Sequence, residues 1–371
     1  MTLVARVLVY PVDRVRFRRT GAFDPYASGP ATHASTMHYP LPSTLAGLLA
    51  SIGYSRPEPP ADPLEGVKAL LEGQGCACRS VKLRPGYVVS RGKVYAALAG
   101  GYAELQALRR AVPEALEAYL DALEAYLEGS ASRGSELLEK AGRALRGAYA
   151  EAKPEWRMGV GLERAVKVAR EGYLYSAAEL DLKAALGADA AVAAEILGAD
   201  CASTREYAAR FASDGAPVKV EVAPGQILLE ELPGDEQCVA LLQVTPILLP
   251  EPPRTSGPLA TTTLLQQAVK SAEILLATST LKPLFDSKTT LVTPGYSLKD
   301  GRHRDPLPGI AGNTLAIAKA NPRKTYEEGA GLHSDTGWGT LIPIQLPEKL
   351  CEKAAKLREK HQQKSKNPFN P

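Results

Sequence analysis

Apolar and polar positions along the chain follow two periods. A period of two, rich in β-branched residues, predicts strands, whereas a period near 3.6 predicts amphipathic helices. Strand patterns cover residues 2–10, 81–98, 156–182 around a charged loop, 217–232, 238–249, 289–298, 314–320 and 340–346. Helical patterns cover residues 43–53, 64–73, 102–128, 134–152, 263–279 and 348–366. This alternation predicts an α+β fold with a repeated β-α-β-β unit.

Three further segments complete this outline. The alanine-rich residues 183–199 predict a loop and a helix, and residues 205–212 predict a short turn. The helix over 348–366 has seven basic and three acidic residues and no continuous apolar stripe. A helix without such a stripe has no face to bury, so we expect it to be exposed or frayed.

Composition places the chain among globular proteins of the cytoplasm. With 371 residues, 45% hydrophobic and 23% charged, two domains are expected. The five cysteines include Cys76-Ala77-Cys78, a spacing too short for a zinc knuckle, so we expect free thiols in a reducing cytosol. Arg6 interrupts the N-terminal apolar run, and no run approaches the ~20 residues that span a membrane. We therefore expect a cytoplasmic protein with no membrane partner.

Basic residues gather near the N-terminus. Arg14, Arg16, Arg18 and Arg19 lie in a segment that alternates in part with Val15 and Phe17. Arginines along a strand are suited to phosphate contacts in nucleic acid. The alternative is a solvated sheet face with no ligand.

A long loop over residues 20–42 precedes the first helix. Its last part holds Thr36, Met37, His38 and Tyr39, side chains able to stack on or hydrogen-bond to unpaired bases. Pro42 stiffens the start of the helix, and we expect Ser43 or Thr44 to cap it. The same free N–H groups attract an anion, so a cap and a phosphate site are compatible here.

Two later segments carry the other candidate contacts. Lys167 and Arg170 flank a charged loop between strand-like runs. The glycine-rich residues 329–339 include Gly331, His333, Ser334 and Trp338, and glycine permits close backbone approach and positive φ. A flexible surface loop is the alternative for this segment.

Signatures of enzymes and metal sites are missing from the sequence. It has no G-x-S-x-G, H-E-x-x-H, P-loop or dinucleotide fingerprint. His33 and His38 lie five residues apart with no ligand set beside them. His38 as a general acid–base in RNA cleavage remains an alternative. We expect no catalytic residue, no metal and no cofactor.

Four segments together resemble one family. "FDPYASGPATHASTMHYPLPSTLAGLL" (23–49) is similar to the start of RAMP-superfamily CRISPR proteins. "MGVGLERAVKVAREGYLYSAAEL" (158–180), "LVTPGYSL" (291–298) and "GAGLHSDTGWGTLIPI" (329–344) resemble segments of the third subunit of the Cmr effector in type III-B CRISPR systems, a Cas5-like group.

The resemblance implies an architecture and a role. The fold would be two ferredoxin-like (RRM-like) domains with a helical insertion and a glycine-rich loop: residues 1–237 with the insertion at about 102–152, then 238–347, then a charged tail at 348–371. It implies a non-catalytic subunit that binds the repeat-derived 5′ tag of the CRISPR RNA. Its other partners would be the large polymerase-cyclase subunit and a backbone RAMP subunit.

The alternative within the same superfamily is a metal-independent Cas5-like endoribonuclease that processes CRISPR repeat RNA. The two hypotheses differ in the role of His38, which is an RNA contact in the first and a catalyst in the second.

Overall fold

The computed structural model describes most of the chain. The described residues are 4–11, 17–18, 33–34, 36–53, 62–98, 101–150, 155–162, 169–209, 218–251, 260–279, 289–292, 296–297, 302–303, 305–310, 312 and 314–366. Helices and sheets are both abundant, which confirms the predicted α+β class.

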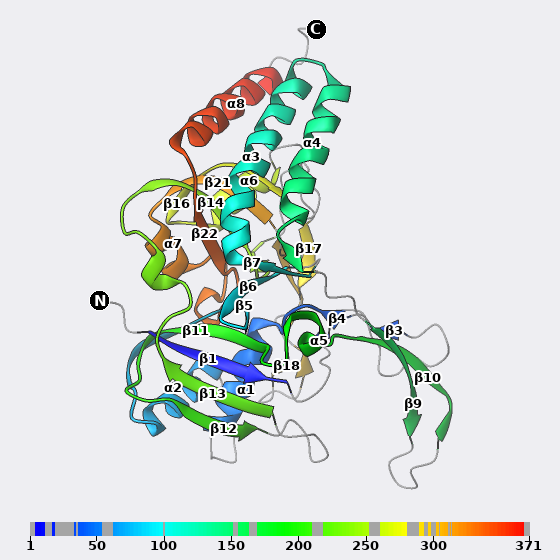
Figure 1. Ribbon diagram of the computed structural model, residues 1–371, viewed down its shortest axis with the longest axis vertical. Helices are drawn as coiled ribbons and strands as arrows, with labels where there is room; N and C mark the ends of the chain where they lie inside the picture. The colour runs from blue at the N-terminus through cyan, green and yellow to red at the C-terminus, as the bar shows by residue number, and fades with distance from the viewer. Residues whose placement is uncertain are drawn as a thin grey trace.

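An eight-stranded antiparallel sheet forms the first layer (Figure 1). In spatial order its strands are β12 (Arg205–Ala209), β13 (Val218–Pro224), β1 (Val4–Tyr10), β11 (Ala191–Asp200), β5 (Ala77–Ser90), β6 (Lys93–Leu98), β7 (Gly101–Glu104) and β8 (Tyr149–Ala150). The strand pattern predicted over 81–98 is confirmed, and it forms a hairpin in which β5 pairs with β6. Its turn has positive φ at both Arg91 (51°) and Gly92 (70°), the backbone that suits a tight hairpin.

The two faces of this sheet are buried against different partners. In β1, Ala5, Val7 and Val9 pack with helices α1 (Pro42–Gly53) and α2 (Pro63–Gly73). Val4 and Leu8 point to the opposite face and join the largest core of the molecule. The period of two in this run therefore separates two hydrophobic clusters.

A four-stranded antiparallel sheet forms the second layer. Its order is β16 (Ala272–Ser279), β21 (Thr314–Ala320), β14 (Gln237–Gln243) and β22 (Leu341–Gln345). Helix α6 (Ala260–Ala268) covers one face through Leu264 and Leu265. The other face meets the first sheet in one continuous core, to which Tyr87 and Leu197 contribute from the first layer and Ile317 from the second.

Shorter strands build the periphery. One three-stranded sheet contains, in spatial order, β3 (His33–Ala34), β10 (Ala169–Glu179) and β9 (Glu155–Leu162), and another contains β15 (Ile247–Leu248), β20 (Leu307–Ile310) and β17 (Thr289–Val292). Two-stranded sheets pair β18 (Tyr296–Ser297) with β19 (Arg302–His303), and β2 (Phe17–Arg18) with β4 (Thr36–Met37). The β9–β10 hairpin projects from the body as an arm (Figure 1). Helices α5 (Leu182–Leu186) and α7 (Pro322–Glu328), with the one-turn helices η1 (Leu229–Glu231) and η2 (Ser334–Thr336), complete the elements.

Three helices rise above the sheets. Helices α3 (Leu105–Leu127) and α4 (Ala131–Arg146) form a hairpin inserted between β7 and β8, where two amphipathic helices are predicted. The C-terminal helix α8 (Glu348–Lys366) packs beside α3 (Figure 1). The predicted bounds of α8 are confirmed.

The prediction that α8 is exposed or frayed is wrong. Leu350, Cys351, Ala354 and Leu357 are buried in the main core, all within its first three turns. Burying one leucine contributes about 1.5–3 kcal/mol, more than an exposed ion pair at about 0–1 kcal/mol. A short apolar stripe is therefore enough to hold a helix whose remaining positions are charged.

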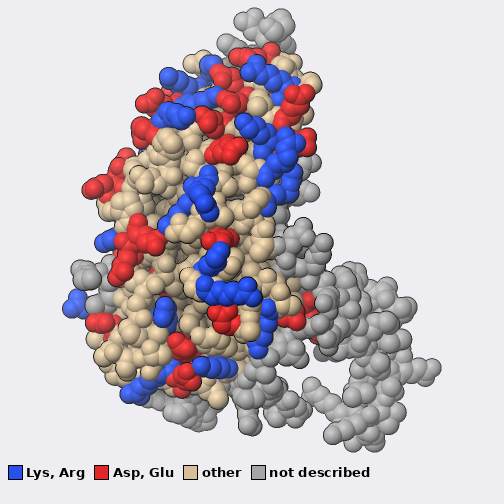
Figure 2. Space-filling model, viewed as in Figure 1, with Lys and Arg blue, Asp and Glu red and all other residues tan. Residues whose placement is uncertain are grey.

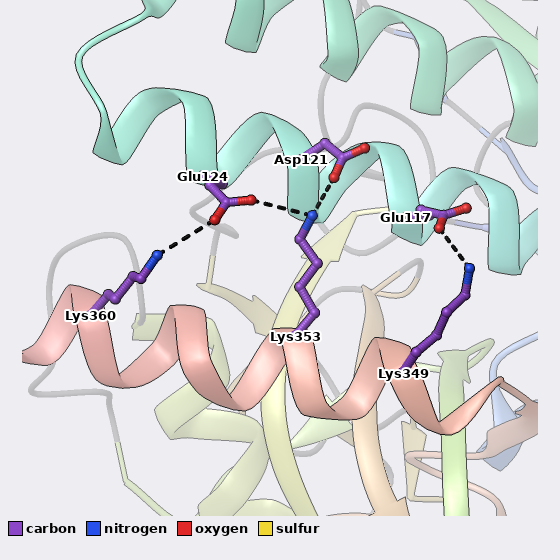
Figure 3. Close-up of polar contacts among 6 residues, drawn as sticks. All are labelled: Glu117, Asp121, Glu124, Lys349, Lys353 and Lys360. Carbon is purple, nitrogen blue, oxygen red and sulfur yellow. Dashed lines mark hydrogen bonds and ion pairs between the residues drawn. The ribbon is translucent and has the colours of Figure 1, made fainter.

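Ion pairs align α8 with α3 (Figure 3). Lys349 Nζ lies 2.9 Å from Glu117 Oε1, and Lys360 Nζ lies 3.5 Å from Glu124 Oε1. Between them, Lys353 contacts Asp121 and lies 3.4 Å from Glu124 Oε2. Burial lowers the pKa of Lys353, but its hydrogen bonds and charge attraction to the two carboxylates outweigh burial and raise the pKa overall. Because these acids and lysines recur along one face of each helix, they fix the register of the pair.

Some element predictions are wrong. The strand predicted over 217–232 ends at Pro224 and is followed by η1, and in three other cases a strand replaces a helix or turn. Residues 183–199 hold only the short α5 before the central strand β11, and residues 205–212 contain β12. The helix predicted at 263–279 ends at Ala268 and is followed by β16. Alanine favours helices locally, but in β11 its small side chain lets both faces of the sheet pack closely, and tertiary contacts override propensity.

The prediction of free thiols is also wrong for four of the five cysteines. Cys76 pairs with Cys201 and Cys238 pairs with Cys351, and only Cys78 is free. Among the described helices, none has the length and apolar character to cross a bilayer.

We predict that Lys353→Glu lowers the free energy of unfolding by about 1 kcal/mol, because it places a third carboxylate beside Asp121 and Glu124. The raised pKa of Lys353 means that its contribution is complete at pH 7 and is lost only as pH rises through that value. Urea denaturation at pH 7 measures the effect.

The matched control is Lys140→Glu on the exposed face of α4, which should change stability little. The double variant Lys353→Glu/Asp121→Lys should recover part of the loss. Equal loss in all three variants would contradict a specific α3–α8 pairing.

Candidate nucleic-acid interface

The glycine-rich loop between α7 and β22 adopts a backbone that few residues other than glycine tolerate. Its four glycines have positive φ: Gly329 (66°), Gly331 (73°), Gly337 (95°) and Gly339 (65°). A Cβ added at Gly331 would lie 2.3 Å from the Leu248 carbonyl oxygen, and one at Gly337 would lie 2.3 Å from Pro85 Cδ. The loop therefore needs glycine for both its conformation and its close packing.

Hydrogen bonds fix this loop on the strands beneath it. The Leu332 amide donates to the Leu248 carbonyl (2.9 Å), and the Gly339 amide donates to the Pro246 carbonyl (2.9 Å). Thr245 Oγ1 donates to the Gly337 carbonyl (2.8 Å). Because many of its backbone groups are hydrogen-bonded, the segment has a defined conformation. It is therefore not the flexible surface loop that the sequence left as an alternative.

One part of the loop presents backbone amides without a protein partner. His333 adopts left-handed geometry (φ 55°, ψ 28°) directly before η2. Within the described residues, no hydrogen bond is formed by the amides of His333, Ser334 and Asp335, and the His333 side chain is exposed. Successive N–H groups at a left-handed to right-handed transition form a concave surface that suits an anion.

A buried arginine ties this loop to the first sheet. Arg84 lies in β5 and is fully buried. Its guanidinium donates to four backbone carbonyls: Tyr326 (2.6 Å), Leu83 (2.7 Å), Ser334 (2.8 Å) and Glu327. Burial lowers the pKa of Arg84, partly offset by nearby Tyr326 and Asp335. Tyr326 and Glu327 lie in the last turn of α7, so the cation also meets the negative end of that helix.

A buried carboxylate joins the same two layers and the segment between them. Glu195 of β11 accepts from the Leu228 amide (2.7 Å), the Leu229 amide (3.3 Å) and the Ile227 amide. Its other oxygen accepts from the Tyr326 hydroxyl, which in turn accepts from the Tyr87 hydroxyl (2.9 Å). Burial and the Glu195 charge raise the pKa of both tyrosines, so both hydroxyls stay protonated donors.

Sequence reasoning missed these scaffold residues. Strand register places Glu195 beside Arg84 on one side and Arg6 on the other, across three neighbouring strands. The sequence signal that could have revealed them is a charged residue inside an apolar strand pattern, as at Arg84 in Arg84-Pro85-Gly86. Charged residues in buried strands are rare unless they are paired or hydrogen-bonded.

The start of α1 differs from its prediction in one respect. The helix begins at Pro42, and the Leu41 carbonyl accepts from the amides of Thr44 (2.9 Å) and Leu45 (3.2 Å). Ser43 and Thr44 therefore lie in the first turn, and neither caps it, because both fall inside the helix. Ser43 Oγ is buried and has no hydrogen-bond partner among the described residues, and the Thr44 side chain is exposed.

The residues before α1 are held by the first layer. Tyr102 donates to the His38 carbonyl (2.6 Å), and its ring meets the His38 ring edge-on at 5.6 Å. Tyr39 is 7% exposed and donates to the Ala193 carbonyl (2.8 Å). Tyr39 is thus a core residue whose ring is not free to stack on a base. Met37, in β4, and His38 are half-buried.

The start of α1 and the glycine-rich loop meet in one apolar cluster. Trp338 is 2% exposed and packs with Leu248 and Val292, and Leu41 packs against this group. Helix α1 also contacts η2. Two of the segments expected to bind RNA, about 290 residues apart, are therefore neighbours. Trp338 acts as their shared anchor and does not face solvent.

The remaining predicted contacts lie wholly or partly outside the described residues. Arg14, Arg16, Arg19 and Lys167 are outside them. Three others are described in their backbone only: Arg18 in β2, Thr36 in β4 and Arg170 in β10. Within the described part of the chain, no group of three or more His, Cys, Asp or Glu side chains could hold a metal ion.

Comparison with known proteins first identifies the fold. No protein-family model matches the chain. A chain in the cryo-EM structure of the Type III-B Cmr-beta complex bound to cognate target RNA superposes with a TM-score of 0.50 and 18% identity, covering 84% of this chain and 86% of that one. The architecture is therefore that of a chain found in a type III-B complex.

A sequence relative is more specific. The chain is 34% identical over 70 residues to the CRISPR system CMR subunit Cmr3 of Saccharolobus solfataricus. The match covers 19% of this chain and 22% of that protein's length. The predicted resemblance to the third Cmr subunit is thereby confirmed, and at the level of sequence it covers this segment of the chain.

We predict that Tyr326→Phe lowers the free energy of unfolding by about 1–3 kcal/mol, because it leaves a buried Glu195 oxygen and the Tyr87 hydroxyl without their partner. Chemical denaturation followed by tryptophan fluorescence measures the loss.

Tyr95→Phe is the matched control, since Tyr95 is half-buried in β6 and its hydroxyl has no hydrogen bond among the described contacts. If the two variants were equally stable, the network across the layers would contribute nothing measurable.

Proposed function

We propose that this chain is a non-catalytic subunit of a type III-B CRISPR effector complex that binds the 5′ repeat-derived tag of the CRISPR RNA. It bridges the large polymerase-cyclase subunit to a backbone RAMP subunit. The observation that carries the proposal is the meeting of the α1 start with the glycine-rich loop at Leu41 and Trp338. The likeness to Cmr3 supports the choice of complex.

Sheet order supports two ferredoxin-like domains. In the second layer, β14, α6, β16, β21, α7 and β22 follow the β-α-β-β-α-β order, and the antiparallel sheet runs β16-β21-β14-β22. In the first layer, β1, β5, β11 and β13 repeat this strand order as β13-β1-β11-β5. Helices α1 and α2 lie between β1 and β5, and no helix is described between β11 and β13. We assign the domains to residues 1–237 and 238–347, followed by the segment 348–371, whose helix α8 packs back on α3.

The geometry of the site supports a single-stranded RNA ligand. The amides of His333 and Ser334 are donors for phosphate oxygens, and the first turn of α1 adds its positive end and the Thr44 hydroxyl. In this proposal Gly331 shapes the loop, and Met37, His38, Ser43 and the other RNA-binding candidates surround the tag. The arginines at 14, 16, 18 and 19 with Lys167 and Arg170 supply positive charge.

The three-helix region supports a protein-binding role. Acidic and basic side chains alternate over α3, α4 and α8 (Figure 2). A surface of mixed sign creates no strong positive field for RNA, and it suits contacts with protein subunits. In this proposal the helices meet a neighbouring subunit and the loop side of the molecule meets the RNA.

A non-catalytic role is consistent with the surroundings of His38. Its ring packs edge-on against Tyr102. A cleavage site also needs a group that stabilises the leaving oxygen, whereas in this proposal His38 is a contact residue for the RNA.

We predict that Thr44→Glu weakens binding of a tag-bearing RNA by about tenfold or more, because a carboxylate in the first turn of α1 repels phosphate. The same charge is favourable to the helix itself, so folding is unaffected. Filter binding at fixed salt, with tagged and untagged RNA of equal length, measures the effect.

Ser132→Glu is the control, since Ser132 is an exposed hydroxyl in the first turn of α4. It should leave affinity unchanged. Equal affinity for tagged and untagged RNA in the unaltered protein would refute tag binding. Metal-independent cleavage of repeat RNA that His38→Ala abolishes would establish the endoribonuclease instead.

A further inference from the structure

The pairing of four cysteines connects distant parts of the chain. Cys76 lies before β5 and Cys201 after β11, two neighbouring strands, and the pair closes a sequence separation of 125 residues. Cys238 of β14 pairs with Cys351 of α8 across 113 residues. A bond that closes so long a segment removes much conformational freedom from the unfolded chain.

All four sulfur-bearing side chains are protected. Cys76, Cys201, Cys238 and Cys351 are buried, the last completely. A soluble thiol reaches such a bond only after local or global opening of the structure. Both bonds are therefore kinetically shielded from reductant in the folded state.

Helix α8 covers polar groups that would otherwise face solvent. Arg358 donates to the Ile274 carbonyl (2.9 Å) on β16, the edge strand of the second sheet. Lys349 and Lys353 neutralise the acidic face of α3. Beyond Leu357, no residue of α8 is buried among those whose side chains are described. The covalent link at Cys351 lies at the start of the helix, where its apolar contacts also lie.

We propose that the working protein carries both disulfides, and that the Cys238–Cys351 bond acts as a latch. By this we mean that the oxidised bond holds α8 on the second sheet and on α3. Each bond forms when two thiols lose two protons and pass two electrons to an acceptor disulfide of a thiol–disulfide oxidoreductase. The acceptor is thereby reduced to two thiols. This inference is independent of the RNA-binding proposal.

The first test counts thiols in the full-length protein purified without reductant. Iodoacetamide in denaturant should add one adduct, at Cys78, and five adducts after reduction. Peptide mapping should recover the 76–201 and 238–351 cross-links. Five adducts without reduction would overturn the proposal.

The second test separates the roles of the two bonds. We predict that Cys238→Ala/Cys351→Ala lowers Tm by roughly 5 °C or more and exposes α8 to trypsin at Lys349, Lys353 and Lys356 in the folded protein. Cys76→Ala/Cys201→Ala should lower Tm without exposing α8, and Cys78→Ala should change neither. Unchanged Tm and unchanged cleavage of α8 in the first variant would refute the latch even if the bonds form.

Discussion

A guanidinium from one layer, buried among carbonyl groups of the other, is the contact on which the rest of this molecule depends. Arg84 is fully buried and loses its hydration on folding. Its hydrogen bonds compensate for that loss only when α7 and the glycine-rich loop hold their carbonyl groups in the observed positions. Removing one partner from a buried charge costs far more than the pair contributes in net stability. The arginine therefore acts mainly as a constraint on geometry, and the loop geometry is what the candidate interface uses.

Glu195 provides the opposite charge in the same interior. It fixes the segment that connects the two layers through three consecutive amides, and it fixes α7 through Tyr326. Apolar burial still supplies most of the stability, since one continuous core runs from the first sheet to α8. The polar contacts determine which of many possible apolar packings is adopted, as buried networks can when every member is satisfied.

Sequence patterns could predict much of the fold because strands such as β1 bury opposite faces at a period of two. They failed where long-range packing decides the outcome. The alanines of β11 favour a helix in isolation, and only the neighbouring β1 and β5 make a strand the better choice. The disulfides could not be paired from spacing, because sequence alone does not specify which distant cysteines meet.

The candidate site was predictable in part for a similar reason. Glycine clusters and the proline at the start of α1 are local signals, and both lie in segments with a defined backbone structure. That Tyr39 and Trp338 are anchors and not exposed contacts depends on what covers them, which no local pattern contains. Arg84 and Glu195 have roles that exist only after both layers are assembled.

The placement of β1 has a consequence for how the protein is made. Residues 4–10 are synthesised well before their strand partners at residues 192–197 and 219–224. At a synthesis rate of about 5–20 residues per second, on the order of tens of seconds pass on the ribosome before the partner strands of β1 have been made. During that interval an apolar strand is exposed, so correct folding in the cell depends on what shields the nascent chain.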